Sequence, residues 1–240
     1  DGRFTRKPKP LPENLQTFAK FVGRSGLDIG FALDPDADRL VMVTGGGKVL
    51  SEELTLAVAT DYILSKTPGP IAANLASTML LDDIAKKHGV PIYRTKIGEI
   101  NVTTRMMETG AIIGGEGNGG VIYPRVHPGR DALTGMGIVL EALAVSGKTI
   151  EQWVSQYPSY VIIKDKIPAK ALSFSEVEQK LIQAFQPCEI DRTDGIKLSG
   201  EKYWLILRES NTEPIIRIIA EAEGSEKARE CVAKAKEILA

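Results

Sequence analysis

The sequence predicts an α/β fold, in which one or more parallel-sheet α/β domains precede a C-terminal α+β domain with a small antiparallel sheet. Two observations support this expectation. Between residues 71 and 114, short apolar runs alternate with amphipathic stretches, the pattern of a parallel sheet covered by helices. After residue 159, short strands and tight turns lie between two amphipathic helices, as in an antiparallel sheet with helices on one face. A length of 240 residues suits one large domain or two to three small ones.

The N-terminal part predicts a helix, two strands and a second helix. Apolar side chains recur at helical spacing in the first stretch, and Ser51 with two following glutamates is a typical helix start. The predicted ranges are 12–22 (helix), 28–33 and 40–43 (strands) and 52–65 (helix). We expect a domain boundary near Lys48, which gives a first domain over residues 1–48.

The middle part, residues 49–158, predicts a domain with a parallel sheet. Ser77 is the expected N-cap of its second helix, because a serine hydroxyl accepts a hydrogen bond from a free helix N–H group. The expected strands are 71–75, 91–95 and 111–114, and the further helices are 77–88, 99–109, 131–145 and 150–156.

The last part, residues 159–240, predicts the α+β domain. A Ser-x-x-Glu pattern at Ser173 and Glu176 is typical of a capping box at the start of a helix. The expected strands are 160–167, 189–191, 195–198, 203–208 and 214–220, and the helices are 173–185 and 225–239.

Composition excludes several classes of partner. Thirty basic and thirty-one acidic side chains give a net charge of −1, so no overall field attracts nucleic acid or an anionic membrane. Cys188 and Cys231 have neither metal-site spacing nor a disulfide framework, which favours a reducing cytoplasm. No apolar run reaches the roughly 18 residues of a membrane span, and no signal peptide opens the sequence.

The acidic loop, residues 34–39, is the first candidate site. Asp34, Asp36 and Asp38 follow a short apolar strand at alternate positions, and Arg39 comes next. Three carboxylates held together repel one another unless a cation lies among them, and their oxygens are ligands that Mg²⁺ prefers. An acidic surface turn and an aspartyl phosphatase stay open as alternatives. An EF-hand is excluded, since its sixth and twelfth positions would hold Arg39 and Gly45.

The glycine loop, residues 114–120, is the second candidate. Its glycines surround Glu116 and Asn118, whose carboxylate and amide groups suit the hydroxyls of a sugar. The spacing is not that of a dinucleotide-binding loop. A plain glycine-rich hairpin is an equally good interpretation of this loop taken alone.

The arginine segment, residues 208–217, is the third candidate. Arg208 ends an apolar strand, and Ser210, Asn211 and Thr212 add small donors in one tight loop, as in a phosphate-binding nest. Arg217 faces the same anion or pairs with an acid such as Glu221. A polar hairpin turn is the better interpretation of the segment on its own.

Several other polar residues are weaker candidates. Arg94 and Lys96 lie before Gly98-Glu99, and Arg130 precedes a helix that Asp131 caps; we interpret them at least equally as surface residues. His88 and His127 have no partner nearby in sequence and are interpreted as a helix-end and a loop residue. A ligand that contacts all three main segments would have a phosphate at one end and a sugar in the middle, and would react with help from a metal at its other end. Such a site favours an enzyme that transfers a phosphoryl group on a phosphosugar.

In combination, these motifs resemble the α-D-phosphohexomutase family, over essentially the whole chain and in order. Asp34-Pro-Asp-Ala-Asp-Arg39 is similar to its Mg²⁺ loop, and Arg208-Glu-Ser-Asn-Thr-Glu-Pro-x-x-Arg217 to its phosphate-binding loop. Gly115-Glu-Gly-Asn-Gly-Gly120 lies where the family has its sugar-recognition loop. The resemblance implies four domains around a cleft, of which this chain supplies the end of domain 2, domain 3 and domain 4.

The family reaction moves a phosphoryl group between positions 1 and 6 of a hexose phosphate, through a phosphoserine and a hexose bisphosphate intermediate. The resemblance implies that the three aspartates hold Mg²⁺ and that Arg39 contacts the phosphoserine or the reacting phosphate. Lys96, a candidate catalytic residue, and Glu99 are weaker carry-overs. It further implies that Glu116 and Asn118 bind sugar hydroxyls, with Arg130 as a weaker substrate-binding candidate. At the other phosphate it implies Arg208, Ser210, Asn211, Thr212 and Arg217.

The sequence departs from the family pattern at two places, and these affect the expected substrate and the expected activity. Asn118 and Gly120 stand where the family's sugar loop usually has Ser and His, which leaves the hexose open. No segment resembles the Ser-His-Asn-Pro loop that carries the phosphoserine, and the first residues look like an interior loop. We therefore expect a C-terminal fragment that is inactive without its N-terminal domains. The alternatives are a metal-dependent sugar-phosphate phosphatase and a non-catalytic sugar-phosphate-binding module.

Overall fold

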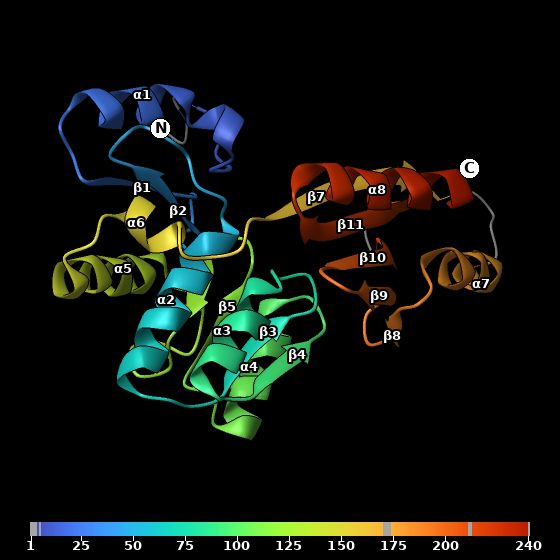
Figure 1. Cartoon of the computed structure of the whole chain (residues 1–240). Helices are drawn as coiled ribbons and strands as arrows, with labels where there is room; N and C mark the ends of the chain where they lie inside the picture. The colour runs from blue at the N-terminus through green and yellow to red at the C-terminus, as the bar shows by residue number, and fades with distance from the viewer. Residues whose placement is uncertain (1–3, 5, 170–173, 211–212, 240) are drawn as a thin grey trace. The chain divides into compact units, whose positions relative to one another are not determined.

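The computed structural model describes residues 4, 6–169, 174–210 and 213–239 (Figure 1). The chain divides into two compact units, Asp1–Tyr157 (the N-terminal unit) and Pro158–Ala240 (the C-terminal unit). The predicted fold class is confirmed: the N-terminal unit contains a mainly parallel sheet with helices, and the C-terminal unit contains an antiparallel sheet. None of the described helices is both long and apolar enough to span a bilayer.

The N-terminal unit begins with a helix packed on a two-stranded hairpin. Strands β1 and β2 pair antiparallel in the register Leu33↔Leu40, so the acidic loop is the connection between them. Residues 12–14 form a 3-10 turn, and the α-helix therefore starts later than the sequence predicts. The elements are η1 (Pro12–Asn14), α1 (Gln16–Arg24), β1 (Ile29–Leu33) and β2 (Leu40–Thr44).

The sheet of the N-terminal unit has the order β4-β3-β5-β6. Its first three strands are parallel, and β6 pairs antiparallel with β5 through the glycine loop. Because the parallel strands end at the same edge, the segments that follow them meet there. The strands are β3 (Ile71–Asn74), β4 (Ile92–Thr95), β5 (Ile113–Glu116) and β6 (Gly120–Ile122).

Helices surround this sheet. Helix α2 is buried on nearly all sides, in keeping with its weak amphipathic pattern. Helix α5 begins at an Asp131 cap, whose carboxylate accepts from the Leu133 and Thr134 backbone N–H groups, as predicted. The helices are α2 (Glu53–Lys66), α3 (Leu80–His88), α4 (Glu99–Thr109), α5 (Ala132–Ser146) and α6 (Ile150–Val154).

The prediction that Ser77 caps α3 is wrong. Ser77 Oγ donates to Asn74 Oδ1 at 3.0 Å and accepts from the Gly117 backbone N–H at 2.9 Å. The helix starts at Leu80, whose N–H donates to Thr78 Oγ1 at 3.1 Å. The Ser77 hydroxyl thus ties the end of β3 to the glycine loop, a tertiary use that local sequence does not reveal.

A buried carboxylate connects two helices of the same unit with the segment that follows α6. Asp61 in α2 accepts from Lys87 Nζ at 2.9 and 3.0 Å, from the Tyr157 hydroxyl at 3.0 Å, and lies 2.6 Å from His88 Nε2. Trp153 Nε1 donates to the Tyr157 oxygen at 2.7 Å. His88 therefore has a specific partner, and its interpretation as a lone helix-end residue is incomplete.

The C-terminal unit is a five-stranded antiparallel sheet with two helices on one face. Its core contains apolar side chains from the sheet, such as Leu205, Leu207 and Ile218, and from the helices, such as Leu181 and Val232. Ser173 of the expected capping box lies outside the described residues. The elements are β7 (Tyr160–Pro168), α7 (Phe174–Phe185), β8 (Glu189–Asp191), β9 (Ile196–Gly200), β10 (Tyr203–Glu209), β11 (Ile215–Glu223) and α8 (Ser225–Leu239).

Candidate active site

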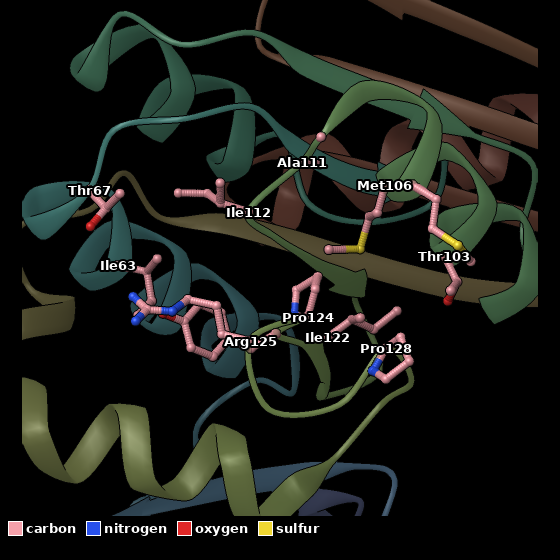
Figure 2. Close-up of a pocket in the computed structure, with 13 residues that line it drawn as sticks. Ile63, Thr67, Thr103, Met106, Ala111, Ile112, Ile122, Pro124, Arg125 and Pro128 are labelled. Carbon is pink, nitrogen blue, oxygen red and sulfur yellow. The ribbon is translucent and has the colours of Figure 1, made fainter.

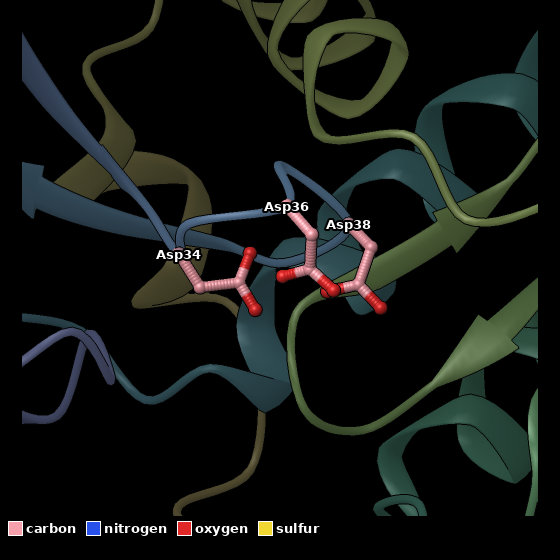
Figure 3. A group of neighbouring side chains, drawn as sticks. All are labelled: Asp34, Asp36 and Asp38. Atoms are coloured by element: carbon pink, nitrogen blue, oxygen red, sulfur yellow. The ribbon is translucent and has the colours of Figure 1, made fainter. Parts of the chain in front are cut away.

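The acidic loop brings its three carboxylates together. One oxygen from each of Asp34, Asp36 and Asp38 lies within 4.8 Å of the other two, and Figure 3 shows the side chains converging from one loop. Asp36 is exposed, whereas the other two are half-buried. Within the described part of the chain, no other group of three His, Cys, Asp or Glu side chains comes this close.

The backbone of the acidic loop is held in an uncommon conformation. Ala37 has a φ of 55°, in the left-handed region that costs a residue with a Cβ roughly 1–2 kcal/mol. Its carbonyl accepts from the Ala132 N–H at the start of α5, and Asp34 Oδ1 accepts from the Arg39 N–H at 3.1 Å. These contacts fix the loop so that alternate side chains point to one place.

The electrostatics of the loop fit a divalent cation. Burial, and after it the neighbouring carboxylates of Asp34 and Asp36, raise the pKa of Asp38 to about 6, although Arg130 opposes this shift. Asp38 Oδ1 is buried and has no hydrogen-bond partner among the described residues. Arg39 Nε lies 3.4 Å from Asp34 and 3.5 Å from Asp38, which balances only part of the negative charge. Three hard oxygen donors with incomplete charge balance are a suitable set for Mg²⁺.

Arg130 joins the acidic loop to two other segments. Its guanidinium group contacts Asp38 Oδ2, donates from NH1 to Glu116 Oε2 at 2.8 Å and from Nε to Glu99 Oε2 at 3.2 Å. The Arg130 backbone N–H also donates to Glu99 Oε1 at 2.8 Å. Only 12% of the side chain is exposed, so its interpretation as a surface residue is wrong.

The glycine loop is a hairpin that packs against the start of β2. Leu40 N donates to Gly119 O at 3.0 Å, and a Cβ on Gly119, whose φ is 91°, would lie 2.4 Å from Leu40 O. Glu116 is buried and accepts from Asn74 Nδ2 at 2.7 Å and Gly98 N at 2.9 Å. Asn118 is half-buried; its Oδ1 accepts from Gly120 N, and its amide nitrogen has no partner in the described part of the chain.

Arg94 and Lys96, both interpreted from the sequence as surface residues, have different environments in the structure. Lys96 is exposed, and its side chain makes no hydrogen bond or ion pair with the described residues. Arg94 is not a plain surface residue, because its guanidinium donates to the carbonyls of Asn74, Ser77 and Thr78 at 2.9–3.0 Å. Arg94 therefore stabilises the loop that follows β3.

The C-terminal unit carries the arginine segment at the end of two paired strands. Arg208 in β10 lies directly opposite Arg217 in β11, and Arg217 lies opposite Lys166 in β7. Asp194 lies 3.5 Å from Arg208 NH1, while Arg208 Nε is buried without a hydrogen-bond partner among the described residues. Like charges in opposing positions destabilise a sheet, so this row of cations favours an anion as its counterpart.

Three further expectations concern the same segment. Ser210 is half-buried, and its backbone N–H donates to Ile215 O at 3.0 Å, which closes the hairpin. Asn211 and Thr212 lie outside the described residues. The alternative that Arg217 pairs with Glu221 is wrong: Arg217 is exposed, and Glu221 is buried and accepts from Trp204 Nε1 at 2.7 Å.

The N-terminal unit also has an apolar pocket of about 320 Å³ (Figure 2). It lies between α4, the end of α2 and the loop after β6. Its lining includes Ile112, which directly precedes β5, whereas Glu116 is the last residue of that strand. No carboxylate and none of the predicted site residues line this pocket, so it is separate from the candidate site.

Comparison with known proteins identifies the family. Three consecutive domain models of phosphoglucomutase/phosphomannomutase match the chain: α/β/α domain II at residues 1–47, α/β/α domain III at residues 51–160 and the C-terminal domain at residues 163–238. The chain belongs to the α-D-phosphohexomutase family. The three candidate loops of this phosphohexomutase-family chain each fall within a different matched domain.

Curated relatives of this phosphohexomutase-family chain agree with the domain models. The phosphoglucomutase/phosphomannomutase of Thermococcus kodakarensis is 38% identical over 96% of this chain and 51% of its own length. The phosphoglucosamine mutase of Methanococcus vannielii is 32% identical over 96% of this chain and 54% of its own length. The chain thus spans about half the length of the curated relatives it matches.

Solved structures show the same fold. A phosphoglucomutase/phosphomannomutase family protein from Burkholderia thailandensis is 27% identical, with a TM-score of 0.82 over 98% of this chain and 52% of its own. The N-acetylphosphoglucosamine mutase of Aspergillus fumigatus, solved with GlcNAc-6P and magnesium, is 16% identical and has a TM-score of 0.65 over 92% of this chain and 52% of its own. At that identity, the second likeness supports the fold alone.

Proposed function

We propose that this chain is the metal- and substrate-binding part of a phosphohexomutase, which moves a phosphoryl group between positions 1 and 6 of a hexose phosphate. The observation that carries the proposal is the cluster of Asp34, Asp36 and Asp38 within 4.8 Å, in a chain of this family. When bound there, Mg²⁺ neutralises negative charge on a transferring phosphoryl group. The relatives leave glucose, mannose and glucosamine phosphates as candidate substrates.

In the N-terminal unit, the side chains around the acidic loop have distinct proposed roles. Arg39, which is one-third exposed beside two aspartates, donates to the reacting phosphate, and the exposed Lys96 assists it. Asn118 offers its free amide nitrogen to a sugar hydroxyl. Glu116 binds the sugar as well, although its present hydrogen bonds with Asn74, Gly98 and Arg130 also position the loop.

In the C-terminal unit, the proposed role is to hold the phosphate that does not react. Arg208 and Arg217 supply charge-assisted hydrogen bonds, and Ser210, Asn211 and Thr212 supply small donors. The opposing arginines support this role, because an anion between them relieves their repulsion.

Substituting Arg208 with alanine tests the phosphate role. We expect calorimetric titration with hexose 1-phosphates to show binding about 10–100-fold weaker in Arg208→Ala, because charge-assisted hydrogen bonds contribute about 1.5–3 kcal/mol. Arg192→Ala is the matched control, since Arg192 is an exposed arginine of the same unit that pairs with Glu178. Equal binding by Arg208→Ala and the unmodified chain contradicts the proposed role.

Further parts of the proposal concern the whole protein. We assign residues 1–48, 49–158 and 159–240 to the end of domain 2, domain 3 and domain 4, which the matched spans support. No phosphoserine loop of the family lies among these 240 residues, so the N-terminal domains and a hexose bisphosphate are the partners that turnover requires. The free Cys188 and Cys231 support a cytoplasmic location.

A further inference from the structure

We propose that Arg130 is a positioning residue that sets the affinity of the acidic loop for a divalent cation by orienting Asp38. This inference rests on the proposed function only for the cation at Asp34, Asp36 and Asp38. In this role Arg130 does not need to contact the substrate. It affects cation binding through the Asp38 carboxylate that it holds in place.

The geometry of Asp38 supports this task. Arg130 NH2 contacts Asp38 Oδ2, whereas Asp38 Oδ1 is buried without a hydrogen-bond partner among the described residues. One oxygen of the carboxylate is therefore fixed by the Arg130 guanidinium, and the other, which lies 3.5 Å from Arg39 Nε, accepts no hydrogen bond that a cation would have to replace. Carboxylates that bind metals are commonly held in this way by a second hydrogen-bonding group.

Arg130 is itself fixed from several sides. Glu99 accepts from both its Nε and its backbone N–H, and Glu116 accepts from NH1. Glu116 in turn is held by Asn74 and Gly98. The guanidinium group is thus held by two segments other than the acidic loop. It therefore contacts Asp38 from a fixed position.

The aliphatic part of the Arg130 side chain occupies the space that a side chain at position 120 would fill. A Cβ on Gly120 would be 2.3 Å from Arg130 Cδ and 3.0 Å from Arg130 Cγ, which is too close for either group to stay in place. Gly120 and Arg130 are consequently a matched pair: the glycine makes room for the arginine. Alanine at position 120 should displace Arg130 without altering any charge.

Two roles for Arg130 predict opposite changes in affinity. If Arg130 orients Asp38, its loss weakens cation binding, by about 10–100-fold for a group that supports a metal ligand. If Arg130 acts only as a nearby positive charge, its loss removes repulsion and strengthens cation binding. The sign of the change therefore distinguishes the two.

The experiment is a titration of the 240-residue chain with Mn²⁺, in which electron paramagnetic resonance measures the free ion. We expect binding about 10–100-fold weaker in both Arg130→Gln and Gly120→Ala. Arg130→Lys, which keeps the charge but loses the planar fork, should also bind more weakly than the unmodified chain.

Two matched controls are available in the same unit. Arg125→Gln makes the same chemical change at an exposed position of the preceding loop, and Gly137→Ala adds a Cβ where no atom lies within 4 Å. Both controls should bind Mn²⁺ like the unmodified chain. Thermal unfolding of each variant shows that the N-terminal unit is folded at the titration temperature.

Each outcome has a definite meaning. Unchanged or tighter binding in folded Arg130→Gln overturns the positioning role, and so does unchanged binding in folded Gly120→Ala. The proposed metal site itself is wrong if the unmodified chain does not bind Mn²⁺, or if Asp36→Asn binds Mn²⁺ as tightly as the unmodified chain. In either case this inference is wrong as well. Loss in Asp36→Asn without loss in the Arg130 variants rejects only the role of Arg130.

Discussion

Asp36→Asn is expected to weaken divalent cation binding by more than about 100-fold while leaving the fold intact. Asp36 is exposed and makes no hydrogen bond or ion pair with the described residues, so its replacement removes no stabilising contact. It does remove one of three negative oxygen ligands, which costs more than the loss of a supporting hydrogen bond, itself about 10–100-fold. Calorimetric titration with Mg²⁺ and Mn²⁺ measures the change.

The control for this prediction is Asp28→Asn, the same substitution at an exposed position before β1. It should bind both cations like the unmodified chain. Because Asp36 repels Asp34 and Asp38, Asp36→Asn should also be at least as stable to urea as the unmodified chain when no cation is present. Cation binding of equal strength in Asp36→Asn would show that the carboxylate cluster is an acidic surface turn.

Asp61→Asn is expected to lower the free energy of unfolding by about 3 kcal/mol, because removing one partner of a buried charged network leaves its other polar groups unsatisfied. Asp61 is 5% exposed and connects Lys87, His88 and Tyr157. Urea denaturation of the chain measures the loss. Lys87→Gln is the comparison: with 61% of its side chain exposed, Lys87 should contribute less than about 1 kcal/mol.

The same network gives a pH dependence with a defined sign. Burial raises the pKa of Asp61, but hydrogen bonds with His88, Lys87 and Tyr157 outweigh it and hold the pKa below its usual value. The stabilisation is therefore fully present above the unfolded pKa of about 3.9 and is lost as the pH falls through the lower folded value. Below that value, Asp61→Asn and the unmodified chain should converge in stability. An unchanged difference across this acidic range would contradict the assignment.

Local spacing was sufficient to predict the acidic loop. Aspartates at alternate positions of one short loop have side chains that can reach the same region. The structure brings Asp34, Asp36 and Asp38 together as expected from this spacing. The alternating strands and helices of the N-terminal unit were predictable for the same reason, because periodicity within a segment reflects its buried face. The metal role of the three aspartates stays a prediction.

Contacts between distant segments were not predictable in this way. The partners of Arg130 come from positions 38, 99 and 116, and the Asp61–His88 contact joins residues 27 apart. Ser77 has the local pattern of a helix cap, yet its hydroxyl bonds Asn74 and Gly117 instead. In each case, a polar or charged side chain has a tertiary partner that the local sequence does not indicate.

The structure explains why position 120 is a glycine, which the sequence alone does not reveal. Gly120 is not required by backbone conformation, because its φ lies outside the left-handed region, unlike that of Gly119. A glycine without a conformational reason indicates close approach by another group, and here that group is the Arg130 side chain. Sequence alone could not identify which residue fills the space.

The central claim is that this chain carries the metal-binding and substrate-binding parts of a phosphohexomutase, and phosphorus NMR of a chimera tests it most directly. These 240 residues would replace the corresponding half of the Thermococcus kodakarensis relative, which is 38% identical. With Mg²⁺ and a hexose bisphosphate, we predict exchange between the 1- and 6-phosphates of glucose, mannose or glucosamine, and no exchange by the 240-residue chain alone. A folded chimera that exchanges none of these sugars, or whose exchange survives Asp36→Asn, would contradict the claim.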